Sequence, residues 1–533
     1  MHFPLILPSK PLWRFSWVCF LGMIAGLSSI PVPGFQLFCA LGVSVFLYHS
    51  ETLLFLKRRL LLMGGFAFGY FLVALHWIPC SLHVDWAHYF YLTPIALLGL
   101  PLFFALYHVV GIACVPWHRH VGMLRLGLFI ALWVGLEIIR AEFLTGFPWA
   151  SLGYMWTTCL PIAQLAAYVG PYGLSLLSLL WLTVPYVWMS TLFLKPAKWV
   201  YTFVMLLSFG AAYYQGMQRM ETAQFSPQDP VPMRMVQPNF PQEVVWTPKK
   251  MESILRTFVF LSNLESQYKL RVVLWPEFAM PLAVQRWPWM LDYVKKSIPE
   301  DGFLVTNGFR YARSDASSKG YHVHTSILTF GAGGHSVDFY DKHLLLPFGE
   351  YIPLRAQVDR ILPGMIHKMS AGMGDFERGI GAKTCCADTL PPFIPMLCHE
   401  VIFSGKFHGA QTDKATWILN LTNDGWFLDS LEPYQHLEMA RMRAIEFGLP
   451  LVRVANTGVS AVIDALGRTI LSIPYGRATT ADFLLPPPLE GKTFYARIMQ
   501  ADPYAIISRI LCILMLLKLL TIFFQKLMRR RRS

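Results

Sequence analysis

The sequence predicts a polytopic α-helical membrane domain of about eight spans joined to an extracytoplasmic α/β domain. Three observations lead to this fold class. Hydrophobic residues make up 54% of the 533-residue chain and charged residues only 14%, whereas soluble proteins typically carry about 25% charged residues. Apolar runs are separated by short loops, and Lys and Arg gather on alternate loops. Between the last two apolar runs lies a long segment in which strand-like and helix-like stretches alternate.

The predicted spans begin close to the N-terminus. Lys10 and Arg14 lie at the start of the first run, 13–30, as in a signal peptide. No small-residue cleavage site follows, so we interpret this run as an uncleaved first span. The other seven runs are near 35–48, 60–77, 90–115, 124–139, 172–193, 199–213 and 504–524. The first two runs are short for a bilayer core of about 30 Å, which needs roughly 20 helical residues.

The positions of Lys and Arg predict the orientation of these spans. Under the positive-inside rule, loops rich in Lys and Arg face the cytoplasm. The basic residues on one set of alternate loops are Lys10, Arg14, Lys57, Arg58, Arg59, Arg119, Arg125, Lys195, Lys198, Lys526 and Arg529 to Arg532. We therefore expect both termini in the cytoplasm. The expected domains are 1–219 with spans one to seven, an extracytoplasmic domain over 220–500, and 501–533 with the last span and a basic tail.

The net charge of +13 does not indicate a nucleic-acid partner. Basic residues gather beside the apolar runs, where they serve membrane topology and contact lipid headgroups. The nine cysteines include no Cys-x-x-Cys pair and no zinc-like spacing. We therefore expect no disulfide framework, no metal site and no cofactor.

Within 220–500, strand-like and helix-like stretches alternate, which is typical of a layered α/β fold. The expected helices are 249–268 and 433–447. The expected strands are 233–236, 272–275, 303–306, 325–330, 394–398, 416–421, 451–455 and 460–464.

Three strand-like stretches end in reactive side chains. Cys398 follows an apolar run, Glu277 follows Val-Val-Leu-Trp-Pro, and Lys342 follows a strand-like patch. A thiol can act as a nucleophile, a desolvated carboxylate as a general base, and an amine as a cation for an oxyanion. Glu350, eight residues after Lys342, is a candidate to orient that amine. Taken singly, each has an ordinary interpretation as a buried thiol, a loop carboxylate or a solvated lysine; together they indicate acyl transfer.

The combination resembles the nitrilase (carbon–nitrogen hydrolase) superfamily. The segments that carry this resemblance are Trp-Pro-Glu277, Lys342-His-Leu-Leu-Leu-Pro-Phe-Gly-Glu350, Cys398-His-Glu400 and Asn423-Asp-Gly-Trp-Phe427. The placement of this domain between the seventh and eighth predicted spans is similar to the apolipoprotein N-acyltransferase family of the bacterial inner membrane. Further segments similar to that family are Gly-Phe-Pro-Trp149, Gln-Pro-Asn239 with Trp246, and the stretches 435–441 and 456–460.

The resemblance implies a nitrilase-like αββα sandwich on the periplasmic side of the inner membrane. It also implies that a phospholipid donates an acyl chain to Cys398. The N-terminal amine of a diacylglyceryl-modified apolipoprotein then accepts that chain. Glu277 is the implied base and Lys342 the implied oxyanion partner, with the backbone N–H after Cys398. No cofactor is implied, and nothing requires more than a monomer.

The resemblance also implies supporting positions. Glu350 and Glu400 hold Lys342 and the pocket, whereas Trp246 and Trp149 contact lipid substrate. His399 stands where the family commonly has tyrosine. It keeps the backbone N–H, and its ring either lowers the pKa of the thiol or points away.

Two other functions are compatible with parts of the pattern. One is a membrane-tethered amidase or nitrilase-type hydrolase that uses water as the acceptor. The other is a non-enzymatic transporter or membrane scaffold with an inactive hydrolase-like domain. The few charges within the predicted spans are unfavourable for a transport route.

Overall fold

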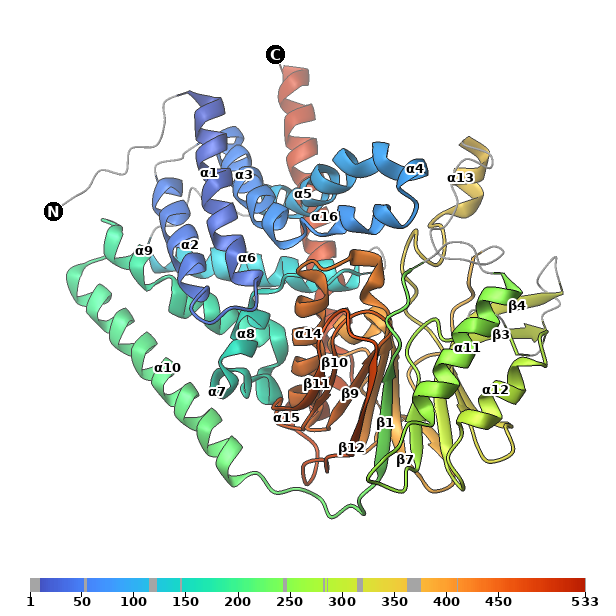
Figure 1. The fold of residues 1–533 in the computed structure, drawn as a ribbon. Helices are drawn as coiled ribbons and strands as arrows, with labels where there is room; N and C mark the ends of the chain where they lie inside the picture. Colours follow the sequence, from blue (N-terminus) through green and yellow to red (C-terminus); the bar gives the residue numbers. More distant parts are fainter. Residues whose placement is uncertain are drawn as a thin grey trace. The chain divides into compact units, whose positions relative to one another are not determined.

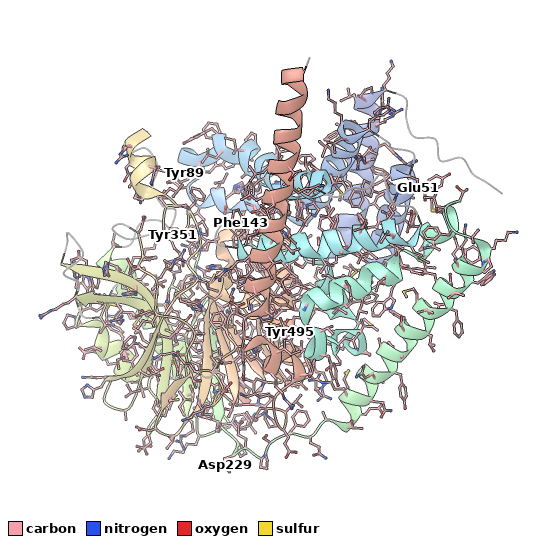
Figure 2. The ribbon with its side chains drawn as sticks, turned by 180° about the vertical axis from the view of Figure 1, so that it is seen from behind. Glu51, Tyr89, Phe143, Asp229, Tyr351 and Tyr495 are labelled. Atoms are coloured by element: carbon pink, nitrogen blue, oxygen red, sulfur yellow. The ribbon has the colours of Figure 1, made fainter. Side chains whose placement is uncertain are left out.

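The computed structural model describes residues 10–51, 55–114, 122–143, 146–242, 247–280, 283–284, 286–313, 320–361, 375–409 and 411–532. The chain forms two compact units. The helical unit comprises Met1–Pro79, Tyr89–Thr222 and Asp502–Ser533, and the α/β unit comprises Cys80–His88 and Ala223–Ala501. Figure 2 shows the side chains, with Asp229 in the segment between the last helix before the α/β unit and its first strand.

The helical unit contains, among its described residues, a long helix at each of the eight apolar runs of the sequence (Figure 1). These helices are α1 (Pro11–Gly26), α2 (Gln36–Ser50), α3 (Leu56–Ala74), α5 (Leu100–Cys114), α6 (Met123–Glu142), α8 (Ala166–Leu182), α10 (Lys195–Thr222) and α16 (Pro503–Arg532). The stretches Pro11–Ser29, Phe90–Cys114 and Ala166–Met189 are long and apolar enough to cross a membrane. The bent pair Leu56–Ala74 and Ile78–Asp85 would form a fourth such span.

Short helical segments connect the long helices. They are η1 (Leu27–Ser29), η2 (Ile78–Asp85), α4 (Trp86–Tyr89), η3 (Phe90–Leu92), η4 (Ile95–Gly99), η6 (Leu152–Thr158), α7 (Leu160–Ala163) and α9 (Val184–Met189). Two glycines allow α1 and α3 to pack with their backbones in contact. A Cβ atom at Gly22 would lie 1.9 Å from the Phe66 carbonyl oxygen, and one at Gly69 would lie 2.0 Å from the Cys19 carbonyl oxygen. Small residues at such crossings are typical of helix pairs in membranes.

The α/β unit contains two six-stranded sheets. The first has the order β12-β1-β2-β3-β4-β5 and the second β11-β10-β9-β8-β7-β6. In each sheet three neighbouring strands are parallel, namely β1–β2–β3 and β7–β8–β9. The strands of the first sheet are β1 (Pro232–Gln237), β2 (Val272–Leu274), β3 (Phe303–Arg313), β4 (Tyr321–Phe330), β5 (Ser336–Asp341) and β12 (Thr479–Leu484). Those of the second are β6 (Cys385–Ala387), β7 (Leu390–Leu397), β8 (Trp417–Thr422), β9 (Leu451–Ala455), β10 (Ser460–Ile463) and β11 (Thr469–Ile473).

The two sheets face each other, with β1 against β9 and β4 against β7. Helix α11 (Pro248–Ser262) covers β1 and β12 and packs against α12 (Met290–Ser297). Helix α14 (Glu432–Phe447) packs on β9 and contacts α15 (Phe494–Met499). The remaining helical segments are α13 (Arg355–Ile361), η7 (Cys398–Ile402) and η8 (Asp424–Phe427). The layers therefore follow the expected αββα order (Figure 1).

All eight expected strands and both expected helices are present; β9 has the expected ends, and the ends of the others are shifted. Helix α11 is shorter than expected, because the guanidinium of Arg234 on β1 donates to the carbonyl oxygens of Ser262, Leu264 and Glu265 at 2.9, 2.6 and 3.2 Å. These contacts satisfy carbonyl groups at the helix end that lack intrahelical partners.

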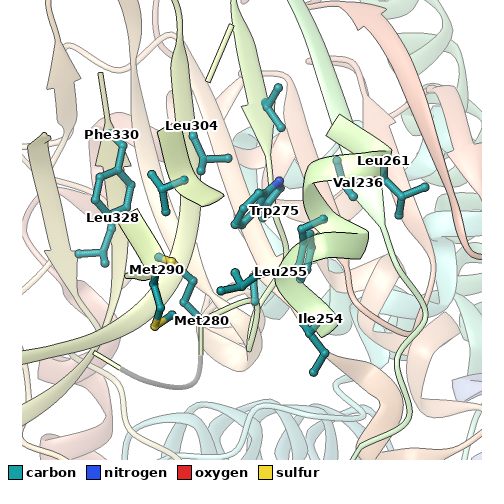
Figure 3. Close-up of a cluster of buried hydrophobic side chains, with 14 of the residues drawn as sticks. Val236, Ile254, Leu255, Leu261, Trp275, Met280, Met290, Leu304, Leu328 and Phe330 are labelled. Atoms are coloured by element: carbon teal, nitrogen blue, oxygen red, sulfur yellow. The ribbon is translucent and has the colours of Figure 1, made fainter. Parts of the chain in front are cut away.

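An apolar core joins α11 and α12 to the outer face of the first sheet (Figure 3). The buried residues of α11 include Met251, Leu255 and Phe258, spaced on one helical face. The Phe258 ring stacks on Trp275 at a centroid distance of 4.5 Å. The Trp275 indole N–H donates to the Ser262 hydroxyl at 2.9 Å. This packing fixes Trp275, which follows β2 and lies two residues before Glu277.

Truncation of the core ring should weaken the α/β unit. We expect Phe258→Ala to lower the free energy of unfolding by about 3–5 kcal/mol, because it removes a buried aromatic side chain and leaves a cavity. Phe260→Ala is the matched control on the same helix, since Phe260 is 66% exposed, and it should change that free energy by less than about 0.5 kcal/mol. Urea unfolding of the full-length protein in detergent measures both. Equal losses in the two variants would contradict this description of the core.

Candidate active site

Cys398 is the first residue after β7, at the start of η7. Its φ angle is +53°, a left-handed conformation that costs a residue other than glycine about 1–3 kcal/mol. The side chain is half-buried, in contrast to the fully buried Leu397 before it. A buried parallel strand therefore ends in a sharp turn that carries the thiol.

Glu277 follows β2 and is buried. Its carboxyl group hydrogen-bonds the Cys398 thiol. Burial raises the pKa of Glu277 to about 7; the Lys342 cation lowers it, and the Glu350 and Asp424 carboxylates raise it. Burial, and then the Glu277 charge, also hold the pKa of the Cys398 thiol well above its usual value. At neutral pH the sulfur keeps its proton, and Glu277 is poised to accept it.

Lys342 directly follows β5 and is buried. Its Nζ donates to Glu350 Oε1 at 2.6 Å, and Glu350 Oε2 accepts from the Leu346 N–H at 2.8 Å. Burial alone would lower the pKa of Lys342, but the Glu350 and Glu277 carboxylates more than offset it and the net shift is upward. The ammonium group therefore stays charged at neutral pH. It favours negative charge on Cys398, because it lowers the pKa of that thiol.

Glu400 is fully buried and connects two segments of the site. Its oxygens accept hydrogen bonds from the Tyr340 hydroxyl at 2.8 Å and from the backbone N–H groups of His343, Leu344 and Leu397 at 3.0, 3.1 and 2.8 Å. Burial raises the pKa of Glu400, but the contacts with His343 and the Lys342 charge outweigh it, so the net shift is downward. One carboxylate thus ties the segment after Lys342 to the strand end before Cys398.

His399 is buried, and its ring lies 6.0 Å from that of Phe403. Burial and the nearby Lys342 charge hold the pKa of His399 well below its usual value. The ring is therefore neutral and supplies no positive charge to the thiol. The alternative in which this histidine lowers the thiol pKa by its charge has no electrostatic support.

The two expected tryptophans differ in what the structure describes. Trp246 lies outside the described residues. Trp149 belongs to the helical unit and is buried, with Phe147 stacked at 5.9 Å and Trp77 at 4.8 Å. Arg140 on α6 donates to the carbonyl oxygens of Phe147 and Trp149 and so fixes this loop.

The structure adds a buried polar cluster for which the sequence predicts no role. It consists of Asn420, Thr422, Asp424, Glu432, His436 and Arg453. The Thr422 hydroxyl lies 3.6 Å from the Cys398 sulfur and 3.0 Å from Asp424 Oδ1. The sequence offered one signal, since Asp424 and His436 lie in two of the segments that resemble the family.

Ligand atoms of Asp424, Glu432 and His436 converge as they would around a metal ion. The Arg453 guanidinium, however, donates to both Asp424 carboxylate oxygens at 2.9 and 2.8 Å and lies 3.1 Å from His436 Nδ1. The positive charge of the Arg453 side chain therefore already neutralises this group of ligand atoms.

The α/β unit has a nitrilase-like fold, and it is joined to a helical unit. The carbon–nitrogen hydrolase family model matches residues 235–482. The model of the apolipoprotein N-acyltransferase N-terminal domain matches residues 21–184.

Relatives named apolipoprotein N-acyltransferase match most of the chain. That of Rhodopseudomonas palustris is 33% identical over 85% of this chain and 84% of its own length. Those of Bradyrhizobium diazoefficiens and Rickettsia typhi are 31% and 29% identical, over 81% and 86% of this chain and 81% and 89% of their own lengths. The chain belongs to the apolipoprotein N-acyltransferase family.

The raised pKa of Glu277 predicts the pH dependence of Cys398 acylation. Glu277 is protonated below about pH 7 and cannot then accept the thiol proton. We expect the acylation rate to rise with pH up to about 7 and then to level off, with no fall caused by Lys342. The measurement is single-turnover mass spectrometry of the protein with phospholipid between pH 5 and 9.

Glu277→Gln is the matched variant, because it keeps the shape and removes the base. It should lose the rising limb, and its plateau rate should fall by about 10²- to 10⁴-fold. A rising limb that persists near pH 7 in this variant would assign the titration to another group.

Proposed function

We propose that this chain is the N-acyltransferase of lipoprotein maturation and works through a Cys398 thioester. The phospholipid is the acyl donor, and the N-terminal amine of a diacylglyceryl-modified apolipoprotein is the acceptor. The observation that carries the proposal is the buried contact of Cys398 with Glu277, beside the Lys342 ammonium group, in a chain of this family. No cofactor takes part.

In the first half-reaction Glu277 accepts the Cys398 proton while the sulfur attacks an ester carbonyl of the phospholipid. The negative charge that develops on the carbonyl oxygen is stabilised by the Lys342 ammonium group and the backbone N–H of His399. The ester C–O bond then breaks, and the alkoxide takes the proton from Glu277. The products are an acyl thioester and a lysophospholipid.

In the second half-reaction the free amine of the apolipoprotein attacks the thioester carbonyl. Glu277 takes a proton from the amine, and the same two donors stabilise the oxyanion. The C–S bond breaks, and the thiolate regains a proton as the amide forms. Glu350 maintains Lys342 in its charged form, and Glu400 holds the two segments that carry Lys342 and Cys398. Trp149 and Trp246 contact the lipid substrate in this proposal.

Membership of this family favours acyl transfer to an amine over hydrolysis. The presence of Glu277, Lys342 and Cys398 favours an enzyme over a non-enzymatic scaffold or transporter. In a buried site the thioester is protected from water, so the acyl group can wait for the second substrate. A water-using amidase would share the same three residues, and the acceptor distinguishes the two activities.

We further propose that the chain crosses the bacterial inner membrane eight times, with both termini in the cytoplasm. In this arrangement 1–219 holds the first seven spans, 220–500 is the periplasmic catalytic domain, and 501–533 is the last span with its tail. The eight long helices and the alternate placement of Lys and Arg support it. A monomer suffices, since one chain supplies Glu277, Lys342 and Cys398.

The thioester can be observed directly. Incubation with phospholipid and no acceptor should add one acyl group to the protein, and neutral hydroxylamine should remove it. Cys398→Ala should show no adduct. The exposed Cys386 in the same unit provides the control, and Cys386→Ala should acylate at the wild-type rate. Intact-mass spectrometry measures all three proteins.

Discharge of the adduct identifies the acceptor. A diacylated lipopeptide with a free amine should remove the acyl group, whereas the N-acetylated lipopeptide should not. Discharge by water alone, at the same rate with and without the amine, would identify a hydrolase. A folded protein that forms no adduct with any phospholipid would contradict the role of Cys398.

The proposed orientation makes Cys386 a marker of the catalytic domain. A membrane-impermeant maleimide added to spheroplasts should label the wild-type protein more than Cys386→Ser, because the exposed thiol faces the outside. In Cys386→Ser the remaining signal reports all other cysteines. A difference that appears only after lysis would place the domain in the cytoplasm.

A further inference from the structure

The backbone on both sides of the nucleophile is held by one buried amide. Asn420 on β8 lies opposite Met396 in the parallel register of β7 and β8. Its Nδ2 donates to the carbonyl oxygen of Met396 at 3.0 Å and to that of Cys398 at 3.1 Å. The amide therefore connects Met396, near the end of β7, to Cys398, the residue with left-handed backbone that follows the strand.

Arg453 fixes the direction in which this amide points. It lies opposite Asn420 in the register of β8 and β9, and its guanidinium donates to Asn420 Oδ1. With the oxygen bound to a guanidinium, the amide nitrogen must face the two carbonyl groups. Arg453 is itself fully buried and held by both oxygens of Asp424.

Asparagine suits this position because its amide has two N–H donors and one acceptor oxygen, and all are used. Aspartate would keep the contact with Arg453 but would turn an oxygen toward two carbonyl oxygens. Leucine has a similar volume and makes none of the three contacts. The opposite side of the turn is held by Glu400, which accepts from the Leu397 N–H at 2.8 Å.

The location of this turn determines the chemistry. The φ angle of +53° at Cys398 is not one that the chain adopts without support. It sets both the direction of the sulfur and that of the His399 N–H, the two groups that must face the same carbonyl carbon and oxygen.

We infer that Asn420, oriented by Arg453 and Asp424, is a positioning residue that holds the Cys398 turn in its reactive conformation. This inference rests on the proposed role of Cys398 as the acyl carrier. Asn420 acts through the backbone and does not touch the substrate. Its loss should reduce the rate of acyl transfer without changing the pH at which Glu277 titrates.

The test uses Asn420→Asp and Asn420→Leu in the full-length protein, with Arg234→Lys as the control. Arg234 is as buried as Asn420. It pairs with Asp482 at 2.7 and 2.8 Å and contacts none of the site residues. Replacement of this arginine should lower the unfolding temperature and leave acylation unchanged. Each folded Asn420 variant should acylate about 10²-fold more slowly at its plateau, because a displacement of about 1 Å suffices for such a loss.

Two further readouts separate positioning from general damage. The midpoint of the pH–rate profile should remain near the wild-type value in both Asn420 variants. Alkylation of Cys398 by iodoacetamide should also remain near the wild-type rate, because a small reagent does not need the oxyanion donors in place.

The outcomes are distinct. A folded Asn420→Asp protein that acylates at the wild-type rate would overturn the inference, and Asn420→Leu provides the same decision if the aspartate variant does not fold. An equal loss of acylation in Arg234→Lys would also overturn it, since the effect would then be one of stability. Absence of a Cys398 adduct in the wild-type protein would instead refute the proposed function.

Discussion

The site depends on the ion pair between the buried Lys342 ammonium group and Glu350. A lone charge in a protein interior is strongly unfavourable, and it persists only when paired and hydrogen-bonded. Glu350, at 2.6 Å from Nζ, supplies the pairing charge. Burial raises the pKa of Glu277 to about 7, because the Lys342 charge, which is also paired with Glu350, offsets the cost of burying the Glu277 carboxylate only in part. The proton of the Cys398 thiol can therefore move to the Glu277 carboxylate. Near neutral pH both the protonated and the ionised form of Glu277 are populated.

The central strands and the reactive residues at their ends could be predicted from the sequence, because buried parallel strands give continuous apolar runs. Strands β6, β11 and β12 are absent from the expected strands, and β5 is expected only as the strand-like patch before Lys342; these four strands are the edges of the two sheets. Strands β5 and β11 are largely exposed, β12 is mostly half-buried, and β6 has only three residues. None of them has an apolar run that would distinguish a strand from a loop.

Glu277, Lys342 and Cys398 could be selected as candidates because each follows an apolar or strand-like stretch and matches a family segment. Asn420 and Arg453 could not, although both lie within correctly predicted strands. The sequence does not show which group a polar residue inside an apolar run will contact. Its partner depends on the register between strands, and here that register places Met396, Asn420 and Arg453 in one row across β7, β8 and β9. Only a three-dimensional arrangement shows that this row lies beside Cys398, whose carbonyl oxygen accepts from Asn420.

The antiparallel pairing of β1 with β12 has a consequence for how the protein is made. These strands come from the two ends of the α/β unit, so the first sheet is not complete until almost the whole unit has been synthesised. Until then β1 presents unpaired backbone groups at an open edge, together with the apolar Met233, Met235 and Val236, and such edges recruit other strands. The long sequence separation also slows folding. The nascent chain therefore passes through an interval in which its first strand needs protection, and a chain that stops before Thr479 never leaves that interval.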